Sequence, residues 1–394
     1  MIENKSTVAA ASPKAPASKK IQIENVLHDT GNVFKFTLKH INVCYANAIR
    51  RMILSEIPIC VIKTETEAVN QCAITVNTTR FHNEILKQRL SCIPIHLTDL
   101  NVLPGNYVLE LDMKNDTDTM MIVTSEHFRI KNKTTENYIT REEMNNIYPS
   151  NPITGDYVDF CRLRPKISDS IPGEAIQFTA EFSIGNAKEN SMFNVASRCT
   201  YCNTINPEEI AQEWDRRKTA IVEKYPQMTE AELEFEKKNF EFLDANRIYY
   251  PDQFDFEIQS IGTYDNETLV AKACSILQTK FVDLMEAFDA DMVPIRTSET
   301  TMENSYDITL ENEDYTMGKI IEYILYETYY HGGAHKPLSF CGFKKVHPHH
   351  PDSIVRIAFH QKADVNVVRH TMKSVCDEAQ QVCKELHRLF KGAA

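Results

Sequence analysis

The apolar positions near the start of the chain change from a two-residue period to a helical period. From Phe34 to Leu38, apolar side chains alternate with polar ones, which predicts a half-buried strand. Apolar residues then recur every three or four positions, which predicts a helix over residues 43–57 that ends at Pro58. The apolar face of this helix consists of Ala46, Ile49, Ile53 and Ile57.

Similar strands and amphipathic helices recur later in the chain. A strand over 254–261 precedes a helix over 267–288, and a strand over 306–310 precedes a helix over 316–330. The C-terminal helix, over 364–391, carries apolar residues at alternating steps of four and three, which is the spacing of a helix that packs against another helix. The apolar residues of the helix over 267–288 are Val270, Ala273, Leu277, Phe281, Leu284 and Phe288. Those of the helix over 316–330 are Met317, Ile320, Ile321 and Ile324. Those of the C-terminal helix are Val368, Met372, Val375, Ala379, Val382, Leu386 and Leu389.

The remaining stretches predict loops and a mostly β region. Residues 1–20 have little to bury and predict a disordered tail. Residues 64–244 predict a mostly β domain inserted into the first module, with a charged helical segment at 207–243. Residues 291–304 predict a linker, and 341–348 a turn. The expected domains besides tail, insert and linker are a discontinuous first module at 21–63 and 245–290 and a second module at 305–394.

Charge and cysteine content narrow the classes of function. The 394 residues carry 43 Lys and Arg against 55 Asp and Glu, and this net charge of −12 disfavours direct binding to nucleic acid. The 11 cysteines are odd in number and scattered, as expected for reduced thiols in an intracellular protein. The chain has no apolar run near the roughly 20 residues that span a bilayer, and its N-terminus lacks the apolar core of a signal peptide. These features predict a soluble intracellular protein without membrane contact.

Three polar clusters are candidates for chemistry, and none of them predicts an active site. Cys199 and Cys202 form the only CxxC pair, but structural zinc needs four ligands, so we do not expect zinc here. Asp289 and Asp291 stand at a helix end that enters the linker, which predicts solvated acids rather than a magnesium site. The histidines within 347–350 are flanked by prolines, which predicts a rigid turn. We therefore expect no catalytic residue and no cofactor.

The first module resembles the α-like assembly subunits of multisubunit RNA polymerases, which are the bacterial α subunit and the third-largest subunit of archaeal and eukaryotic enzymes. The first matching motif is Ala46-Asn47-Ala48-Ile49-Arg50-Arg51, followed by Glu56-Ile57-Pro58. The second is residues 84–94, which end in Cys92-Ile93-Pro94 and look like the family's second signature, a helix ending in Leu-Ile-Pro. Gln88 and Ser91 depart from the His and Gly that are usual there.

The second module resembles the small α-like partner of that subunit, called the eleventh subunit in eukaryotes and L in archaea. The matching residues are Glu313-Asp314, Thr316, Gly318 and the stretch from Gly342 to Pro348, whereas Tyr315 and Lys319 depart from the usual His and Asn. Cellular polymerases keep the two subunits on separate chains. The fusion resembles that of large double-stranded DNA viruses, which implies a viral source.

The resemblance implies an α+β fold in which two α-like dimerisation modules form an intramolecular pseudo-dimer. The helices over 43–57 and 267–288 are expected to pack against those over 316–330 and 364–391, through the apolar residues named above. Joining the partners in one chain makes their pairing intramolecular, with an effective concentration in the mM range for a short linker.

The resemblance also implies a non-catalytic scaffold of a DNA-directed RNA polymerase, a nucleotidyltransferase complex. Its expected partners are the largest and second-largest subunits and a small subunit of the tenth or twelfth type, with nucleic acid contacted only through the complex. The expected docking residues are Asn47, Arg50, Arg51 and Glu56; two adjacent arginines lie about 100° apart on a helix, so at least one should face away from the core. If viral, the protein would act in the host cytoplasm, in the nucleus or in the virion.

Two alternatives remain open, namely a free-standing binding or transcription-regulatory module with an α-like fold, and a metal- or thiol-dependent protein that uses the CxxC pair.

Overall fold

The computed structural model describes residues 20–168, 170–299, 302–331 and 336–391, so nearly all of the predicted N-terminal tail lies outside the described residues. The chain forms two compact units. Among the described residues, the first unit comprises those within 1–51, 200–257 and 274–394, and the second comprises those within 52–199 and 258–273. The fold is mixed α and β, as expected. The segment at 207–243, which the sequence places in the inserted domain, belongs to the first unit.

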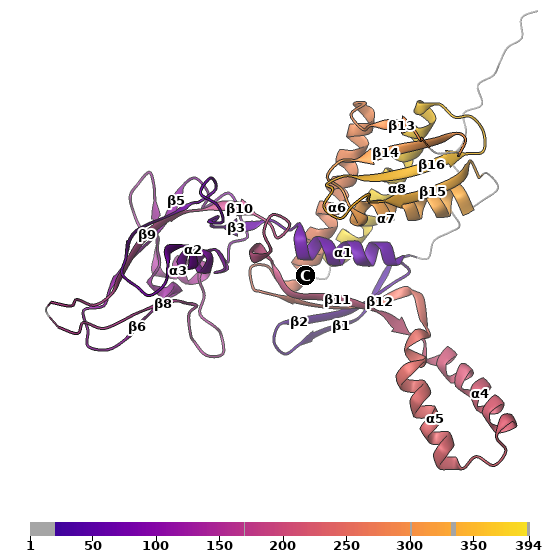
Figure 1. Cartoon of the computed structure of the whole chain (residues 1–394), viewed down its shortest axis with the longest axis horizontal. Coiled ribbons are helices and arrows are strands. Elements are labelled where there is room, and N and C mark those ends of the chain that lie inside the picture. The colour runs from indigo at the N-terminus through magenta and orange to yellow at the C-terminus, as the bar shows by residue number, and fades with distance from the viewer. Residues whose placement is uncertain (1–19, 169, 300–301, 332–335, 392–394) are drawn as a thin grey trace, which may run out of the picture. The chain divides into compact units, whose positions relative to one another are not determined.

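The first sheet has the strand order β1-β2-β12-β11 (Figure 1). Its strands are β1 (Gln22–Asp29), β2 (Val33–Lys39), β12 (Tyr249–Ser260) and β11 (Ala196–Ile205). The predicted alternation in β2 is confirmed, because Phe34, Phe36 and Leu38 are buried. Phe36 stacks on Phe256 of β12 with 5.0 Å between ring centroids. This contact joins the start of the chain to a strand more than 200 residues later.

The second sheet has the order β13-β14-β16-β15 and corrects two predictions. Its strands are β13 (Ile295–Thr297), β14 (Ser305–Leu310), β16 (Ser353–Phe359) and β15 (Leu338–Lys344). Strand β13 lies within the predicted linker and pairs with β14. Residues 341–344, predicted as part of a turn, continue β15 and pair with β16. Gly342 interrupts the apolar alternation of β15, which is why the pattern reads as a turn.

Four helices lie wholly or mainly in the first unit, and all but one begin and end within two residues of the predicted positions. They are α1 (Val43–Ser55), α6 (Asn266–Asp289), α7 (Tyr315–Ile324) and α8 (Val365–Lys391). Asn42 caps α1 through a hydrogen bond that its Oδ1 accepts from the backbone N–H of Cys44, 2.9 Å away. The exception is the predicted helix at 316–330, because α7 gives way to a π-helix over Leu325–His331.

Gly318 allows α7 to approach strand β15 closely. A methyl group at this position would lie 2.0 Å from the ring of Phe343. We therefore expect Gly318→Ala to lower the free energy of unfolding by about 1–3 kcal/mol through overpacking, measured by urea denaturation. A matched variant that adds Phe343→Leu should recover part of the loss. A Gly318→Ala protein as stable as the wild type would contradict the close packing.

The second unit is built around a sheet of order β4-β9-β5-β7. Its strands are β4 (Cys72–Asn77), β9 (Ala175–Glu181), β5 (Tyr107–Lys114) and β7 (Arg129–Asn132), and two small sheets pair β6 (Met121–Thr124) with β8 (Asp159–Leu163) and β3 (Ile59–Val61) with β10 (Ser183–Gly185). The unit also contains α2 (Asn83–Ser91) and α3 (Arg141–Ile147). The core includes Phe128, Phe160 and Phe178, whose ring centroids lie 5.5–6.0 Å apart.

The charged segment predicted at 207–243 forms a helical hairpin of α4 (Pro207–Lys224) and α5 (Glu230–Leu243) between β11 and β12 (Figure 1). Short 3₁₀ turns occur at Ser125–His127, Ser191–Phe193 and Ala245–Arg247. None of the helices in the described part of the chain has the length and apolar character needed to cross a membrane.

Candidate functional site

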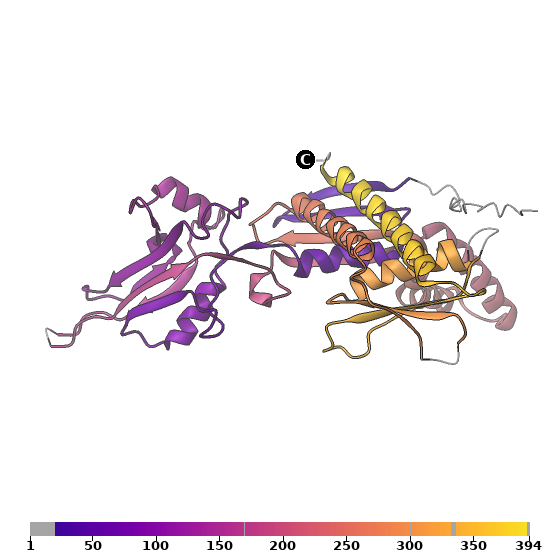
Figure 2. The same ribbon diagram turned by 90° about the horizontal axis from the view of Figure 1, so that it is seen from above.

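Helices α6 and α8 run antiparallel beside each other (Figure 2). At the C-terminal end of α6, Asp289 forms an ion pair with Lys373 near the start of α8. Toward their other ends, Cys274 and Cys383 are both buried, and burial raises the pKa of both thiols; for Cys383, the neighbouring Cys274 raises the pKa further. Leu277 of α6, which lies between these points, is buried. An apolar interior with ion pairs at its edge is the arrangement of a helix–helix interface.

The buried face of α8 follows the period of a straight helix rather than the predicted heptad. Its large apolar and cysteine residues that are fully buried are Val368, Met372, Val375, Cys376, Cys383, Leu386 and Phe390. The prediction named Val382 and Leu389 in place of Cys383 and Phe390, but both are only half-buried. A straight α-helix has 3.6 residues per turn, so its buried face moves ahead of a 3.5-residue repeat by one position after a few turns.

The other predicted dimerisation residues are distributed over α1, α6 and α7. Leu284 is half-buried. Fully buried are Ala46, Ile49, Ile53, Val270, Leu277, Phe281, Met317, Ile320 and Ile324. Burial places them on the packed sides of their helices, while their part in dimerisation stays a prediction.

Helices α1 and α7 are also antiparallel. Near the start of α1, the Tyr45 ring lies edge-on to Tyr323, with 6.4 Å between centroids. Near its end, Arg51 donates a hydrogen bond from Nε to Oγ1 of Thr316 at 2.7 Å. The same guanidinium forms an ion pair with Asp314, which is the N-cap residue of α7. The two contacts fix opposite ends of the helix pair.

Asp314 is positioned to hold both the helix start and the arginine. Its Oδ1 accepts a hydrogen bond from the backbone N–H of Thr316 at 2.8 Å. Burial of the carboxyl acts to raise the pKa of Asp314, but the hydrogen bonds from Thr316 and the charge of Arg51 outweigh burial, so its pKa lies below the ordinary value. The neighbouring residue Glu313 accepts a hydrogen bond from Nζ of Lys280 on α6, at 2.9 Å.

We expect this ion pair to make stability depend on acidity. A carboxyl whose pKa is lower in the folded state stabilises the fold above its unfolded pKa, and that contribution is lost as pH falls through the folded pKa. Asp314→Asn, which keeps a capping oxygen, should therefore be less stable than the wild type at neutral pH, and the difference should shrink below about pH 4. Urea denaturation at several pH values measures this. A difference that is constant from neutral to acid pH would contradict a role for the charge.

The structure places the predicted docking residues in different surroundings. Arg50 donates hydrogen bonds from Nε and Nη2 to Oδ1 of Asn47 at 3.1 and 2.9 Å, and both residues are half-buried on α1. Glu56 forms an ion pair with Lys188 at 2.9 Å. Arg51 is engaged by α7, which the sequence analysis did not anticipate. The docking role of these residues stays a prediction.

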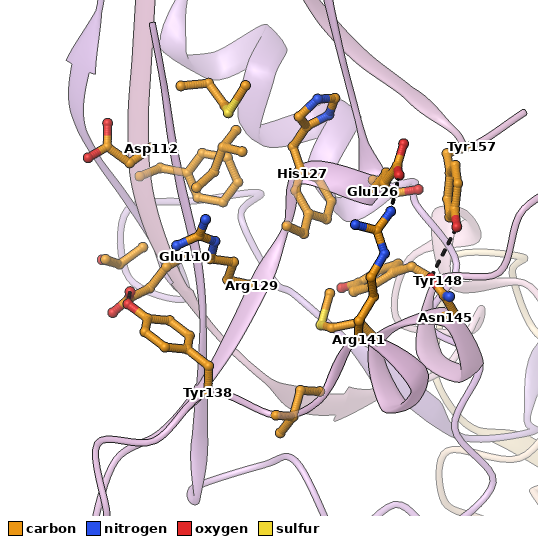
Figure 3. A pocket seen from close by; sticks show the side chains of 18 of the residues that line it. Glu110, Asp112, Glu126, His127, Arg129, Tyr138, Arg141, Asn145, Tyr148 and Tyr157 are labelled. Carbon is orange, nitrogen blue, oxygen red and sulfur yellow. Dashed lines mark hydrogen bonds and ion pairs between the residues drawn. The ribbon is translucent and has the colours of Figure 1, made fainter.

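A cavity of about 870 Å³ lies in the second unit beside β5, β7 and α3 (Figure 3). Phe128, Tyr148 and Phe178 contribute to its apolar lining. Several of its polar side chains pair with one another, namely Tyr138 with Glu110 at 2.8 Å, Tyr157 with Asn145 at 3.0 Å, and Arg141 with Glu126. These polar side chains already bond to one another, so the geometry assigns no ligand to the cavity.

The CxxC cysteines do not face each other. Cys199 is buried and Cys202 is exposed on β11, as expected for strand residues an odd number of positions apart. In the part of the chain that the structure describes, three or more His, Cys, Asp or Glu side chains nowhere gather in a way that could hold a metal ion. The expectation that the protein needs no cofactor stays a prediction.

Sequence reasoning missed Asp314, Lys280 and Glu313 as contact residues. An Asp two residues before a Thr at the start of an apolar helix is a capping signal and could have been recognised. The residues that contact this cap from another helix could not have been recognised, because a sequence does not show which surface charges face each other.

The first unit is of the class in which amphipathic helices pack against sheets, as α8 does on β2 and α7 does on β15. Residues 35–281 match the RNA polymerase Rpb3/Rpb11 dimerisation domain. The chain belongs to this family.

Curated relatives agree with the family. The chain is 24% identical over 309 residues to DNA-directed RNA polymerase II subunit RPB3 of Schizosaccharomyces pombe, covering 73% of this chain and 94% of the relative. It is 23% identical over 310 residues to DNA-directed RNA polymerases I and III subunit RPAC1 of Homo sapiens, covering 68% and 85%. It is 23% identical over 270 residues to DNA-directed RNA polymerase subunit Rpo3 of Pyrococcus furiosus, covering 65% and 92%.

Proposed function

We propose that this chain is a non-catalytic assembly subunit of a DNA-directed RNA polymerase, in which two α-like halves pair within one polypeptide. The observation that carries the proposal is the family match over residues 35–281, together with relatives that are themselves named as polymerase subunits. The match ends within α6 and does not cover the second half. The part of the proposal that concerns the second half is therefore supported by its contacts with the first half.

Two pairs of antiparallel helices support the pairing of the halves. Helix α1 of the proposed first half meets α7 of the second through Arg51 and Asp314, and α6 of the first half meets α8 of the second through Asp289 and Lys373. Each half thus contributes one short and one long helix. A pseudo-twofold arrangement would have this form, since each helix of one half then has a counterpart in the other. In this proposal, residues 291–304, which include β13, join the two halves.

The proposed partners are the largest and second-largest polymerase subunits and a small subunit of the tenth or twelfth type. Asn47, Arg50 and Glu56 are the proposed docking residues, with Arg51 acting at the helix pair as well. The net charge of −12 fits a subunit that reaches nucleic acid only through the complex. A viral source also stays a proposal, which genes for the two largest subunits in the same viral genome would support.

Co-purification tests the proposal directly. The tagged chain, expressed together with the two largest polymerase subunits from the same genome, should retain both in near-stoichiometric amounts through size-exclusion chromatography. A tagged chain that is folded and retains neither large subunit would overturn the proposal and favour a free-standing binding module.

A further inference from the structure

The outer face of α5 exposes large apolar side chains that the described structure leaves uncovered. Phe235 is 64% exposed, Phe242 is 77% exposed and Leu243 is 68% exposed. Phe235 and Phe242 are seven residues apart, which is two helical turns, so they point the same way about 10.5 Å apart along the helix. Leu243 adjoins Phe242. We call these three residues the outer stripe of α5.

The opposite side of α5 already provides the packing that the hairpin has. Phe240 is buried, and the ring of Trp214 from α4 lies 5.7 Å from it. Arg217 of α4 lies over the same ring at 4.8 Å and forms an ion pair with Asp244 at 2.5 Å. The outer stripe is therefore not needed to hold α4 against α5.

Local signals fix the two helices at their starts. Asn206 caps α4, and Thr229 with Glu232 forms a capping box at the start of α5. Helices of this length draw most of their stability from packing an apolar face, and α4 has no fully buried residue. A hairpin that is held by caps, one aromatic contact and the contacts of Arg217, while it exposes two phenylalanines on one face, has the features of a surface for association.

Charge around the outer stripe selects the kind of partner. Glu232, Glu234 and Glu236 lie on either side of the stripe. The two lysines of α5 are paired within the helix, Lys237 with Glu241 at 3.7 Å and Lys238 with Glu234 at 3.2 Å, so acidic residues outnumber basic ones along it. Acidic flanks disfavour nucleic acid and anionic lipid, and they disfavour a second copy of the same stripe, because like charges would then face each other. They favour a segment with apolar residues between Lys or Arg side chains.

The size of the stripe restricts the partner further. Three such side chains bury a few hundred Å² at most, below the roughly 1,200 Å² that stable complexes reach. A contact this small is maintained when other contacts already hold the partner nearby, which raises its effective concentration.

We propose that the outer stripe of α5 docks a basic amphipathic helix of another subunit in the assembled polymerase. A helix offers apolar side chains over two turns, which matches the spacing of Phe235 and Phe242. This inference rests on the proposed function, because it takes the partner from the same complex. The stripe is a second contact, separate from the docking residues on α1.

Amide hydrogen exchange tests the proposal with the whole chain, free and within the purified polymerase. Exchange over residues 230–243 should be at least tenfold slower in the polymerase. Phe235→Ala with Phe242→Ala should keep both large subunits and abolish this protection. Val222→Ala with Tyr225→Ala, which truncates two exposed residues elsewhere in the hairpin, should retain it. Equal exchange in the free and assembled wild-type chain would overturn the inference, whereas failure of the large subunits to co-purify would overturn the proposed function instead.

Photocrosslinking then identifies the partner. With Phe242→p-benzoylphenylalanine, the crosslinked peptide should come from one polymerase subunit and carry Lys or Arg around apolar residues. That peptide, synthesised, should bind the free chain more weakly as salt rises and at least tenfold more weakly after Phe235→Ala with Phe242→Ala. Crosslinks to a second copy, to lipid, to nucleic acid or to an acidic segment would each overturn the proposal.

Discussion

Phe36→Ala and Phe390→Ala should each lower the free energy of unfolding by about 3–5 kcal/mol, the usual cost of emptying a buried aromatic site. Phe36 lies in the first sheet and Phe390 in the last turn of α8, and their rings meet edge to face with 5.0 Å between centroids. Both side chains are almost wholly buried. The contact joins an element of the proposed first half to an element of the proposed second half.

A double-mutant cycle measured by urea denaturation isolates that contact. The two losses should fall short of additivity by about 0.5–1.5 kcal/mol, the coupling expected for an aromatic pair. Leu389→Ala is the matched control, because Leu389 is the neighbouring half-buried residue that a strict heptad would have placed inside. It should cost clearly less than Phe390→Ala. Additive losses, or a Leu389 variant as damaging as the Phe390 variant, would contradict the packing of α8 described above.

Arg50→Glu should abolish co-purification of the large subunits while leaving the isolated chain as stable as the wild type. In the described structure, the hydrogen bonds of Arg50 go to Asn47 on its own helix, so reversing its charge removes little from the fold. At a subunit interface, the same reversal places a carboxylate where a cation is expected, and a like-charge contact there costs several kcal/mol.

Arg51→Glu provides the contrast within the same motif. It would set a carboxylate against Asp314 and remove the hydrogen bond to Thr316, so it should lower the melting temperature of the isolated chain. Thermal denaturation and co-purification of both variants separate the two roles. If Arg50→Glu still assembles, the predicted docking role of Arg50 is wrong. If the Arg51→Glu variant has the same melting temperature as the wild type, Arg51 contributes nothing to the stability of the helix pair.

Much of the helical architecture could be predicted because local period and burial coincide there. Ile49, Phe281, Ile320 and Met372 each belong to a series of apolar residues at helical spacing, and each is fully buried on its own helix. Such patterns report which face of a helix is covered without reference to distant parts of the chain. The family resemblance on the α1 motif was confirmed for the same stretch by the dimerisation-domain match.

The errors arise where local pattern and tertiary packing diverge. Strand β13 has three residues, too few to show alternation, and exists because β14 pairs with it. On α8, choosing Val382 over Cys383 applied a coiled-coil repeat to a straight helix. The pairing of Arg51 with Asp314 spans 263 positions and depends on how two helices cross. Phe235 and Phe242 lie in the segment predicted only as charged and helical, and the structure shows that both side chains are exposed.

Sedimentation equilibrium of the purified chain over a range of concentrations tests most directly whether its two halves close on each other. The account predicts a monomer of 45.2 kDa at every concentration, since pairing inside the polypeptide uses the helical faces that would otherwise join two copies. A stable species of twice that mass, with Phe390→Ala converting it to monomer, would show that the helices pair between chains and would contradict the account.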